Sequence, residues 1–184
     1  RRFWTHSVAC AYIADRLLSR KLLKLDAEIP FDRYWVAALL HDIGKLVIGF
    51  FAWEYYREVV ESVHRRESSF RREEERLEHL LTHEYVGRLV LINAGAPRDT
   101  IEVAATHNTP PGQPRPLVCL VHMANNLAKQ LGFGVIPEAE SRYSASVLMA
   151  LGLKRSDADR LAKTLGDEAA ADVEDIVGRC LNGG

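Results

Sequence analysis

The most apolar stretch of the chain contains three ionisable residues. Residues 35–51 read WVAALLHDIGKLVIGFF, so His41, Asp42 and Lys45 interrupt a run rich in Ala, Leu, Ile and Val. Burying such groups without partners is costly. We therefore expect them to be paired with one another, to bind a ligand, or to be inherited from an ancestor that bound one.

Apolar residues recur at helical spacing through most of the chain. The expected helices cover residues 3–24, residue 31 through the HDIGK stretch, 52–66, 72–92, a short segment reaching residue 107, and 117–131, with two or three short helices after residue 137. Four prolines and a glycine exclude regular structure from residue 108 to 116. No segment alternates polar and apolar residues, so the sequence predicts an all-α bundle of about seven to nine helices.

Composition narrows the class of protein. The chain has 184 residues, of which 47% are hydrophobic and 27% are charged, and its formal net charge is −1. This is the profile of a globular domain with its own core. Because we find no charge excess and no run of about 18 apolar residues, we expect neither DNA binding nor membrane insertion. Cys10, Cys119 and Cys180 lie far apart among apolar residues and predict reduced core thiols in a cytoplasmic protein.

Four histidines and one aspartate occupy unusual positions. The stripe of the first expected helix contains Phe3, His6, Cys10, Ile13 and Leu17, so the His6 ring should point into the core. His41 and Asp42 are adjacent, His83 shares an apolar stripe with two valines, and His107 ends a helix before the proline-rich segment. These side chains come from four helices and can meet in one pocket.

The remaining polar and aromatic candidates have ordinary interpretations. We expect His64, His79 and His122 to be hydrogen-bonded core or boundary residues, with His122 on a wetter face of its helix. The run RREEER at residues 71–76 predicts a solvated, salt-bridged first turn. Tyr55, Tyr56 and Tyr143 either serve a partner surface or, more commonly for such residues, lie in the core or at its boundary.

Five stretches together resemble the HDOD domain, a branch of the HD superfamily. In chain order they are FWTHSVACAYIADRL (3–17), AALLHDIGKLVI (37–48), LEHLLTHEYVGRLVL (77–91), AATHN (104–108) and LVHMANNLAKQLGFG (120–134). The resemblance implies an all-α, HD-domain-like bundle around a divalent metal site. The family usually has further helices before the first stretch, so we expect this chain to lack them. We divide the chain into an HDOD-type core, residues 1–134, and a helical extension, residues 135–184, packing on the same core.

The resemblance also implies a set of metal ligands. His6 corresponds to the first histidine of the superfamily and His41–Asp42 to its His-Asp pair. His83 and His107 correspond to the added histidines of the two-metal branch. The implied ion is a divalent metal such as Fe, Mn, Ni, Zn or Mg.

Two departures from the family pattern weaken the case for catalysis. Asn125 stands where the enzymes carry a distant aspartate, and it offers only a neutral oxygen, which binds a transition ion more weakly. Asn108 stands where the two-metal branch has a second consecutive histidine. The implied site is therefore short of one carboxylate.

Hydrolysis of a phosphate ester would assign roles to two further groups. Asp42 would hold the metal, and Lys45 would hold a phosphate as a point charge or, equally, pair with Asp42. Glu78 and Glu84 are candidates for a general acid, although glutamates at such positions more often form ion pairs.

The resemblance to the HDOD family favours a regulatory role over a catalytic one. HDOD domains are generally regarded as bacterial signalling output modules, often beside response-regulator or cyclic-di-GMP domains. The resemblance thus implies a non-catalytic or weakly active module with a partly retained metal site. Its partner would be a sensor or response-regulator domain, or a nucleotide second messenger. The alternatives are a metal-dependent phosphohydrolase acting on a nucleotide or cyclic dinucleotide, and a purely structural helical scaffold.

Overall fold

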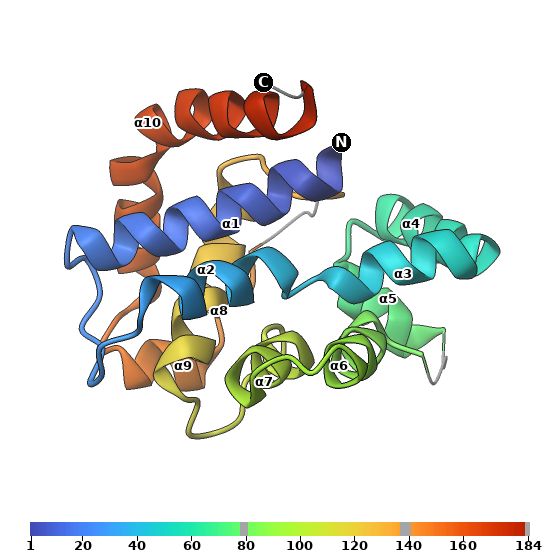
Figure 1. Cartoon of the computed structure of the whole chain (residues 1–184), viewed down its shortest axis with the longest axis horizontal. Helices are drawn as coiled ribbons and strands as arrows, with labels where there is room; N and C mark the ends of the chain where they lie inside the picture. The colour runs from blue at the N-terminus through green and yellow to red at the C-terminus, as the bar shows by residue number, and fades with distance from the viewer. Residues whose placement is uncertain (78–80, 137–140, 183–184) are drawn as a thin grey trace.

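The computed structural model describes residues 1–77, 81–136 and 141–182, and every regular element in these ranges is a helix (Figure 1). The helices are α1 (Arg2–Ser19), α2 (Phe31–Leu40), α3 (Ile43–Phe51), α4 (Trp53–Arg66), α5 (Phe70–Arg76), α6 (His83–Asn93), α7 (Arg98–Thr106), α8 (Pro116–Gln130), α9 (Ala145–Ala150) and α10 (Arg155–Asn182). The all-α prediction is confirmed for this part of the chain.

The described residues form ten helices, where the sequence predicted seven to nine. Two expected helices are each divided: one at His41 and Asp42, and one between α5 and α6, where the side chain of Thr82 accepts a hydrogen bond from the Tyr85 N–H and caps α6. The prediction of only short helices after residue 137 is wrong, because α10 extends over 28 residues.

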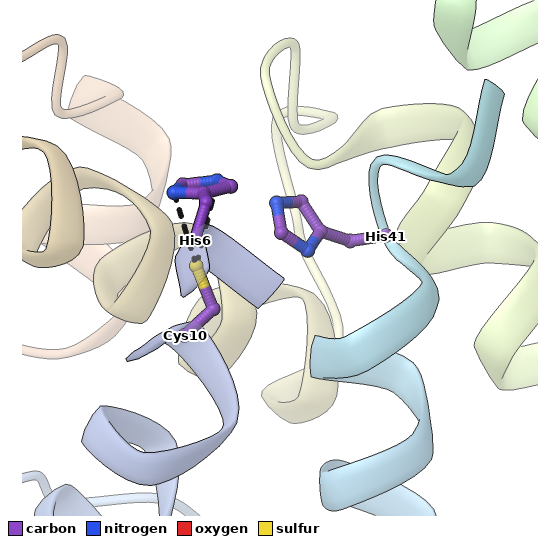
Figure 2. A group of neighbouring side chains, drawn as sticks. All are labelled: His6, Cys10 and His41. Carbon is purple, nitrogen blue, oxygen red and sulfur yellow. Dashed lines mark hydrogen bonds between the residues drawn. The ribbon is translucent and has the colours of Figure 1, made fainter. Parts of the chain in front are cut away.

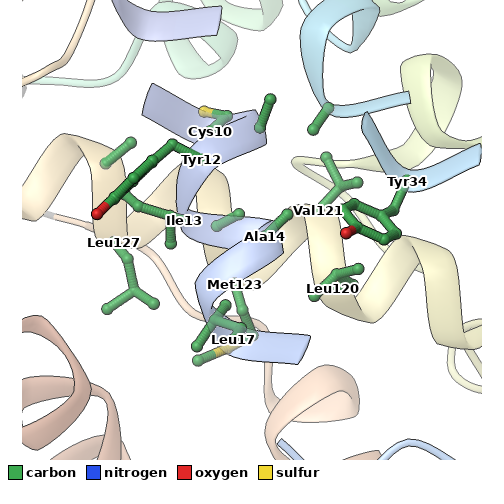
Figure 3. Close-up of a cluster of buried hydrophobic side chains, with 14 of the residues drawn as sticks. Cys10, Tyr12, Ile13, Ala14, Leu17, Tyr34, Leu120, Val121, Met123 and Leu127 are labelled. Carbon is green, nitrogen blue, oxygen red and sulfur yellow. The ribbon is translucent and has the colours of Figure 1, made fainter. Parts of the chain in front are cut away.

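The main core lies between α1 and α8. Twelve consecutive residues of α8, Leu117–Ala128, are buried, and so are ten residues of α1. Figure 3 shows Ile13 and Leu17 of α1 in the same cluster as Met123 and Leu127 of α8. Helices α2 and α10 pack against α1, and α10 crosses it in Figure 1. This arrangement holds the N-terminal helix, and therefore His6, in the centre of the bundle.

A smaller cluster joins α4 and α5 to the bundle. Its buried residues are Val59, Val63, Phe70 and Ile136. Tyr55 and Tyr56 pack against this cluster and Tyr143 against the main core, so the ordinary interpretation of the three tyrosines is confirmed. The division of the chain at residue 134 stays a prediction.

Helices α3 and α6 touch through their backbones. A methyl group built on Gly44 would lie 1.9 Å from the carbonyl oxygen of His83, so only glycine fits this position. The contact brings the start of α3 directly against the start of α6. It therefore places Asp42 beside His83.

One segment reaches the length and apolar character of a membrane-crossing helix, contrary to expectation. This is Phe31–Phe51, 21 residues that comprise α2, the turn and α3. Of its most apolar window, 44% is buried inside the bundle, and the segment carries buried His41, Asp42 and Lys45. Core helices meet the same criterion, so composition here is weak evidence for a membrane span.

The cysteines differ in their surroundings. Cys10 and Cys119 are free and buried, as expected. Cys180 is free but exposed, which contradicts the prediction of a third core thiol. It lies on the solvent side of the last turns of α10, where apolar neighbours in sequence do not guarantee burial.

Candidate metal centre

Asp42 is surrounded by four histidine rings, as predicted. Its Oδ2 atom lies 3.5 Å from His6 Nε2 and 3.6 Å from His41 Nε2. Its Oδ1 atom lies 3.5 Å from His83 Nε2 and 3.1 Å from His107 Nε2. All five side chains are at least 99% buried. The structure thus brings together residues from α1, the α2–α3 turn, α6 and the end of α7.

The break between α2 and α3 orients the aspartate. Asp42 occupies the N-cap position of α3, with φ −103° and ψ 12°, yet its side chain accepts no hydrogen bond from the backbone N–H groups of that helix. Aspartate is a preferred N-cap because its carboxylate normally accepts from the helix N–H groups. Here the carboxylate faces the histidines instead, which indicates a functional role.

Three of the rings are held by backbone carbonyls. His6 Nδ1 lies 3.1 Å from the Phe133 oxygen, His41 Nδ1 lies 2.7 Å from the Ala38 oxygen, and His107 Nδ1 lies 3.2 Å from the Val103 oxygen. A carbonyl only accepts hydrogen bonds, so each Nδ1 carries the ring proton and each Nε2 presents a lone pair.

These lone pairs converge on a carboxylate, which offers no proton of its own. The pKa of Asp42 lies well below its usual range: burial acts to raise it, but Lys45, His41 and His107 outweigh that effect. Burial also lowers the pKa of His41 and of His83 well below the usual range. Neutral imidazoles around an ionised carboxylate are the protonation states that a divalent metal requires.

Two buried polar atoms near the centre, His41 Nε2 and Asn125 Oδ1, have no hydrogen-bond partner among the residues that the structure describes. Such atoms are costly unless something satisfies them. The ligand atoms of His41, Asp42 and His107 all lie within 4.8 Å of one another. Imidazole and carboxylate together suit Zn, Fe, Mn, Ni or Co. The residues therefore fit a divalent metal ion.

Lys45 pairs with the same aspartate. Its Nζ lies 2.8 Å from Asp42 Oδ2 and 5.1 Å from the centre of the Phe70 ring, and the residue is 5% exposed. Lys45 was expected either to bind a phosphate or to pair with Asp42, and the structure shows the ion pair. The ammonium therefore balances the charge of the carboxylate inside the bundle.

Asn125 reaches the centre through Asn108. The Asn125 amide nitrogen lies 3.5 Å from Asn108 Oδ1. The Asn108 amide nitrogen in turn lies 2.7 Å from His107 Nε2 and 3.0 Å from His83 Nε2. Asn108, which the sequence indicated only as a departure from the family pattern, is thus in direct contact with two rings of the centre.

The fourth ring is held by a glutamate that the sequence did not identify. Glu74 Oε2 lies 2.6 Å from His83 Nδ1, and Glu74 Oε1 accepts from the His83 backbone N–H at 2.7 Å. The prediction of a solvated turn at residues 71–76 is wrong for Glu73 and Glu74, which are buried. Burial raises the pKa of Glu74 to about 8. Glu73 and Glu75, on either side of Glu74 in RREEER, are also glutamates, so the sequence alone does not distinguish Glu74 from them.

His122 supports His107 from behind. Its Nδ1 donates to the His107 carbonyl at 2.6 Å, and its Nε2 accepts from the Ser144 N–H at 2.9 Å. The residue is fully buried, so the expectation of a wetter face was wrong: residues 141–144, just before α9, pack against that face of α8. His64 is exposed, which differs from the expected core or boundary position, and His79 lies outside the described residues.

The two glutamates considered as general acids have different outcomes. Glu84 is buried, accepts from Arg71 Nε at 2.7 Å and accepts from the Asn108 N–H at 3.1 Å, so its interpretation as an ion-pair partner is confirmed. Glu78 lies outside the described residues.

A basic cavity of about 180 Å³ adjoins the centre at Asn108. Its lining residues are Ser69, Arg71, Arg72, Glu75, Asn108, Thr109, Asn126, Lys129 and Arg142. Four of these are cationic and one is anionic. Since Asn108 also contacts His83 and His107, an anion in this cavity would lie one side chain away from the centre.

Several solved structures share this fold. An HDOD domain protein of unknown function from Geobacter sulfurreducens matches with a TM-score of 0.73 and 22% identity, over 96% of this chain and 61% of that one. A protein from Marinobacter aquaeolei provisionally described as a signal transduction protein matches at 0.71 and 20%, over 94% and 38%. A protein from Shewanella amazonensis provisionally described as a phosphohydrolase matches at 0.61 and 20%, over 91% and 61%.

This chain spans less than two thirds of each of these structures, and at such identities they establish the fold alone. No curated protein matches the chain. A profile of the HDOD domain matches residues 1–110, well over half of the sequence. That segment carries Asp42 and the four rings around it, in the order and fold that the resemblance predicted. The chain belongs to the HDOD domain family.

Proposed function

We propose that this HDOD domain is a signalling module that holds a divalent metal ion at the Asp42 centre and binds a phosphorylated ligand, a nucleotide, in the adjoining basic cavity. The observation that carries the proposal is the convergence of the Nε2 lone pairs of His6, His41 and His107 on the ionised Asp42 carboxylate. A cation is the species that satisfies such a set of donors.

The domain acts by binding rather than by turnover. Asp42 is the one carboxylate among the predicted ligands, and Asn125 contributes no charge. Lys45 already balances Asp42, which leaves little negative charge to hold two metal ions. A bound metal would supply charge neutralisation for a phosphate and a lowered pKa for water, but the predicted ligands in the described ranges offer no second carboxylate to accept a proton from that water.

The basic cavity supports a phosphorylated ligand. Arg72 and Arg142 line it and are exposed to solvent, and arginine binds phosphate oxygens in a two-pronged geometry. Arg71 is held in place by Glu75 and Glu84. We place the domain in the bacterial cytoplasm, where it would pass the state of a neighbouring sensor or response-regulator domain, or respond to a nucleotide second messenger such as a cyclic dinucleotide.

A metal-dependent phosphohydrolase is the second candidate. Its support is the pairing of His83 and His107 at Asp42 Oδ1, opposite His6 and His41 at Oδ2, which offers two sides of one carboxylate to metal ions. The fold shared with the Shewanella amazonensis protein agrees with it.

Calorimetry with metal-loaded protein tests which phosphorylated ligand binds in the basic cavity. The ligands are inorganic phosphate, nucleoside mono- and triphosphates and cyclic dinucleotides. We expect one class to bind, and the variants Arg72→Ala and Arg142→Ala to weaken binding about tenfold, the loss expected for one charge-assisted contact. The matched control Arg160→Ala, whose side chain is exposed on α10, should bind normally.

A turnover assay completes the test. Phosphate and phosphodiester hydrolysis are followed with Mn, Fe, Ni and Mg, and we expect none above background. Turnover that disappears in His41→Ala would replace the signalling proposal with the enzyme. Absence of any stoichiometric metal after aerobic and anaerobic purification would refute both.

A further inference from the structure

Cys10 lies inside the metal centre, although no family pattern assigns it there. It follows His6 by one turn of α1 and is fully buried. Its Sγ lies 3.6 Å from His6 Nε2. Figure 2 shows both side chains on α1 with the ring of His41 facing them. Ligand atoms of His6, Cys10 and His41 all lie within 4.8 Å of one another.

The spacing is that of two ligands on one ion. Zinc bonds of 2.0–2.1 Å to nitrogen and 2.3 Å to sulfur, at a tetrahedral angle, separate the two ligand atoms by about 3.5 Å. The observed distance from Cys10 Sγ to His6 Nε2 is 3.6 Å. The same nitrogen lies 3.5 Å from Asp42 Oδ2, close to the separation of about 3.4 Å expected for nitrogen and oxygen ligands.

His41 faces this pair from the opposite side. Its Nε2 is buried and has no hydrogen-bond partner in the described part of the chain, and its Nδ1 is already used by the Ala38 carbonyl. An ion between His41 and the pair on α1 would satisfy it.

A Cys10 thiolate would supply negative charge that the other predicted ligands lack. The predicted ligand set contains one anion, Asp42, because Asn125 replaces a carboxylate. On binding a metal, the Cys10 thiol would release its proton to solvent and contribute the second negative charge. Thiolate ligands select Zn, Co or Fe over Mg and Mn.

We propose that Cys10 is a ligand of this metal centre and that the centre is selective for a thiophilic ion such as Zn²⁺. This inference rests on the metal centre of the proposed function. The competing explanation is that Cys10 is a small core residue in van der Waals contact with the His6 ring, as buried free cysteines often are.

The test is titration of the metal-free full chain with Co²⁺, which reports its ligands by absorption. We expect d–d bands of a tetrahedral site together with a near-ultraviolet band from thiolate-to-cobalt charge transfer. In Cys10→Ser the near-ultraviolet band should be lost and Zn²⁺ affinity should fall at least tenfold. The matched variants Cys119→Ser and Cys180→Ser should keep both.

The outcomes distinguish a failure of the Cys10 assignment from a failure of the metal centre itself. Wild-type protein that binds no Co²⁺ refutes the metal centre and the Cys10 assignment together. Co²⁺ binding with an identical spectrum in Cys10→Ser overturns the Cys10 assignment alone. If Cys10→Ser does not fold, X-ray absorption of the Co²⁺-loaded wild type decides, since a sulfur neighbour of the metal supports the assignment and its absence overturns it.

Discussion

Asp42 Oδ1 lies 3.1 Å from Nε2 of His107, a residue 65 positions later in the chain. The contact joins the start of α3 to the end of α7 and closes a ring of histidines around one carboxylate. Asp42 is therefore the residue on which the α1–α2 side and the α6–α7 side of the centre both depend. Its ion pair with Lys45 is the first property that can be tested without any metal.

Asp42→Asn should lower the free energy of unfolding by about 3–5 kcal/mol, because it removes the anion that lies 2.8 Å from the buried Lys45 ammonium. The double variant Asp42→Asn/Lys45→Met should recover most of this loss, because methionine fills the same space without a charge. Urea unfolding of the wild type, both single variants and the double variant gives the coupling energy. Additive effects would show that Lys45 does not depend on Asp42.

Gly44→Ala should destabilise the fold by about 3 kcal/mol, since its methyl group would lie 1.9 Å from the His83 carbonyl oxygen and backbone cannot move aside cheaply. Gly49→Ala is the matched control in the same helix. Its methyl group would meet the Tyr56 ring at an ordinary 3.7 Å, so helix propensity should make it stabilising by about 0.5–1 kcal/mol. Chemical unfolding measures both. Similar values for the two variants would contradict the close contact of α3 and α6.

Glu74→Gln should weaken Zn²⁺ affinity about 10–100-fold, as is usual when the partner of a metal-bound histidine is changed. Glu74 accepts from both the His83 N–H and Nδ1–H, and glutamine has only one accepting oxygen for these two donors. The His83 proton would then move to Nε2, which blocks ligation.

This comparison is best made near pH 8.5, above the Glu74 pKa of about 8, where the carboxyl is ionised. Glu75→Gln is the control, because Glu75 is exposed and pairs with Arg71. Competition with a chromophoric chelator measures the affinities. An unchanged affinity in Glu74→Gln would show that His83 is not a ligand.

Stability should fall in mild acid because of His122. Burial lowers its pKa to about 4, against about 6.5 in an unfolded chain. The unfolded chain therefore takes up this proton first, so the contribution of neutral His122 is complete above pH 6.5 and is lost as pH falls toward 4. The loss amounts to about 3 kcal/mol.

In His122→Gln the free energy of unfolding should fall less steeply over this pH range than in the wild type, measured by urea unfolding at half-unit steps. His41 and His83 titrate in the same direction, so the difference between the two curves isolates His122. His64→Gln, at an exposed position, should follow the wild type. Parallel curves for His122→Gln and the wild type would contradict the assignment.

The sequence by itself determined the helical class and the convergence of the centre. Helical periodicity depends on residues three and four apart, so the stripe that holds His6 could be recognised locally. A histidine or an aspartate on such a stripe must find a partner inside the core. Such positions, together with the resemblance to the HDOD domain, indicate His6, His41, Asp42, His83 and His107 as one set.

The tertiary structure decided which neighbours support them. Glu74 and Glu75 are the same residue type, but only Glu74 faces His83, because α5 packs between α4 and α6. His122 is buried on the face of α8 where Ser144 donates its N–H to the ring and residues 141–142 contact Asn126. Local patterns determine which residues share a face of a helix. Which residues pack against that face depends on chain segments far away in sequence. The burial of a side chain and its protonation state depend on these tertiary contacts.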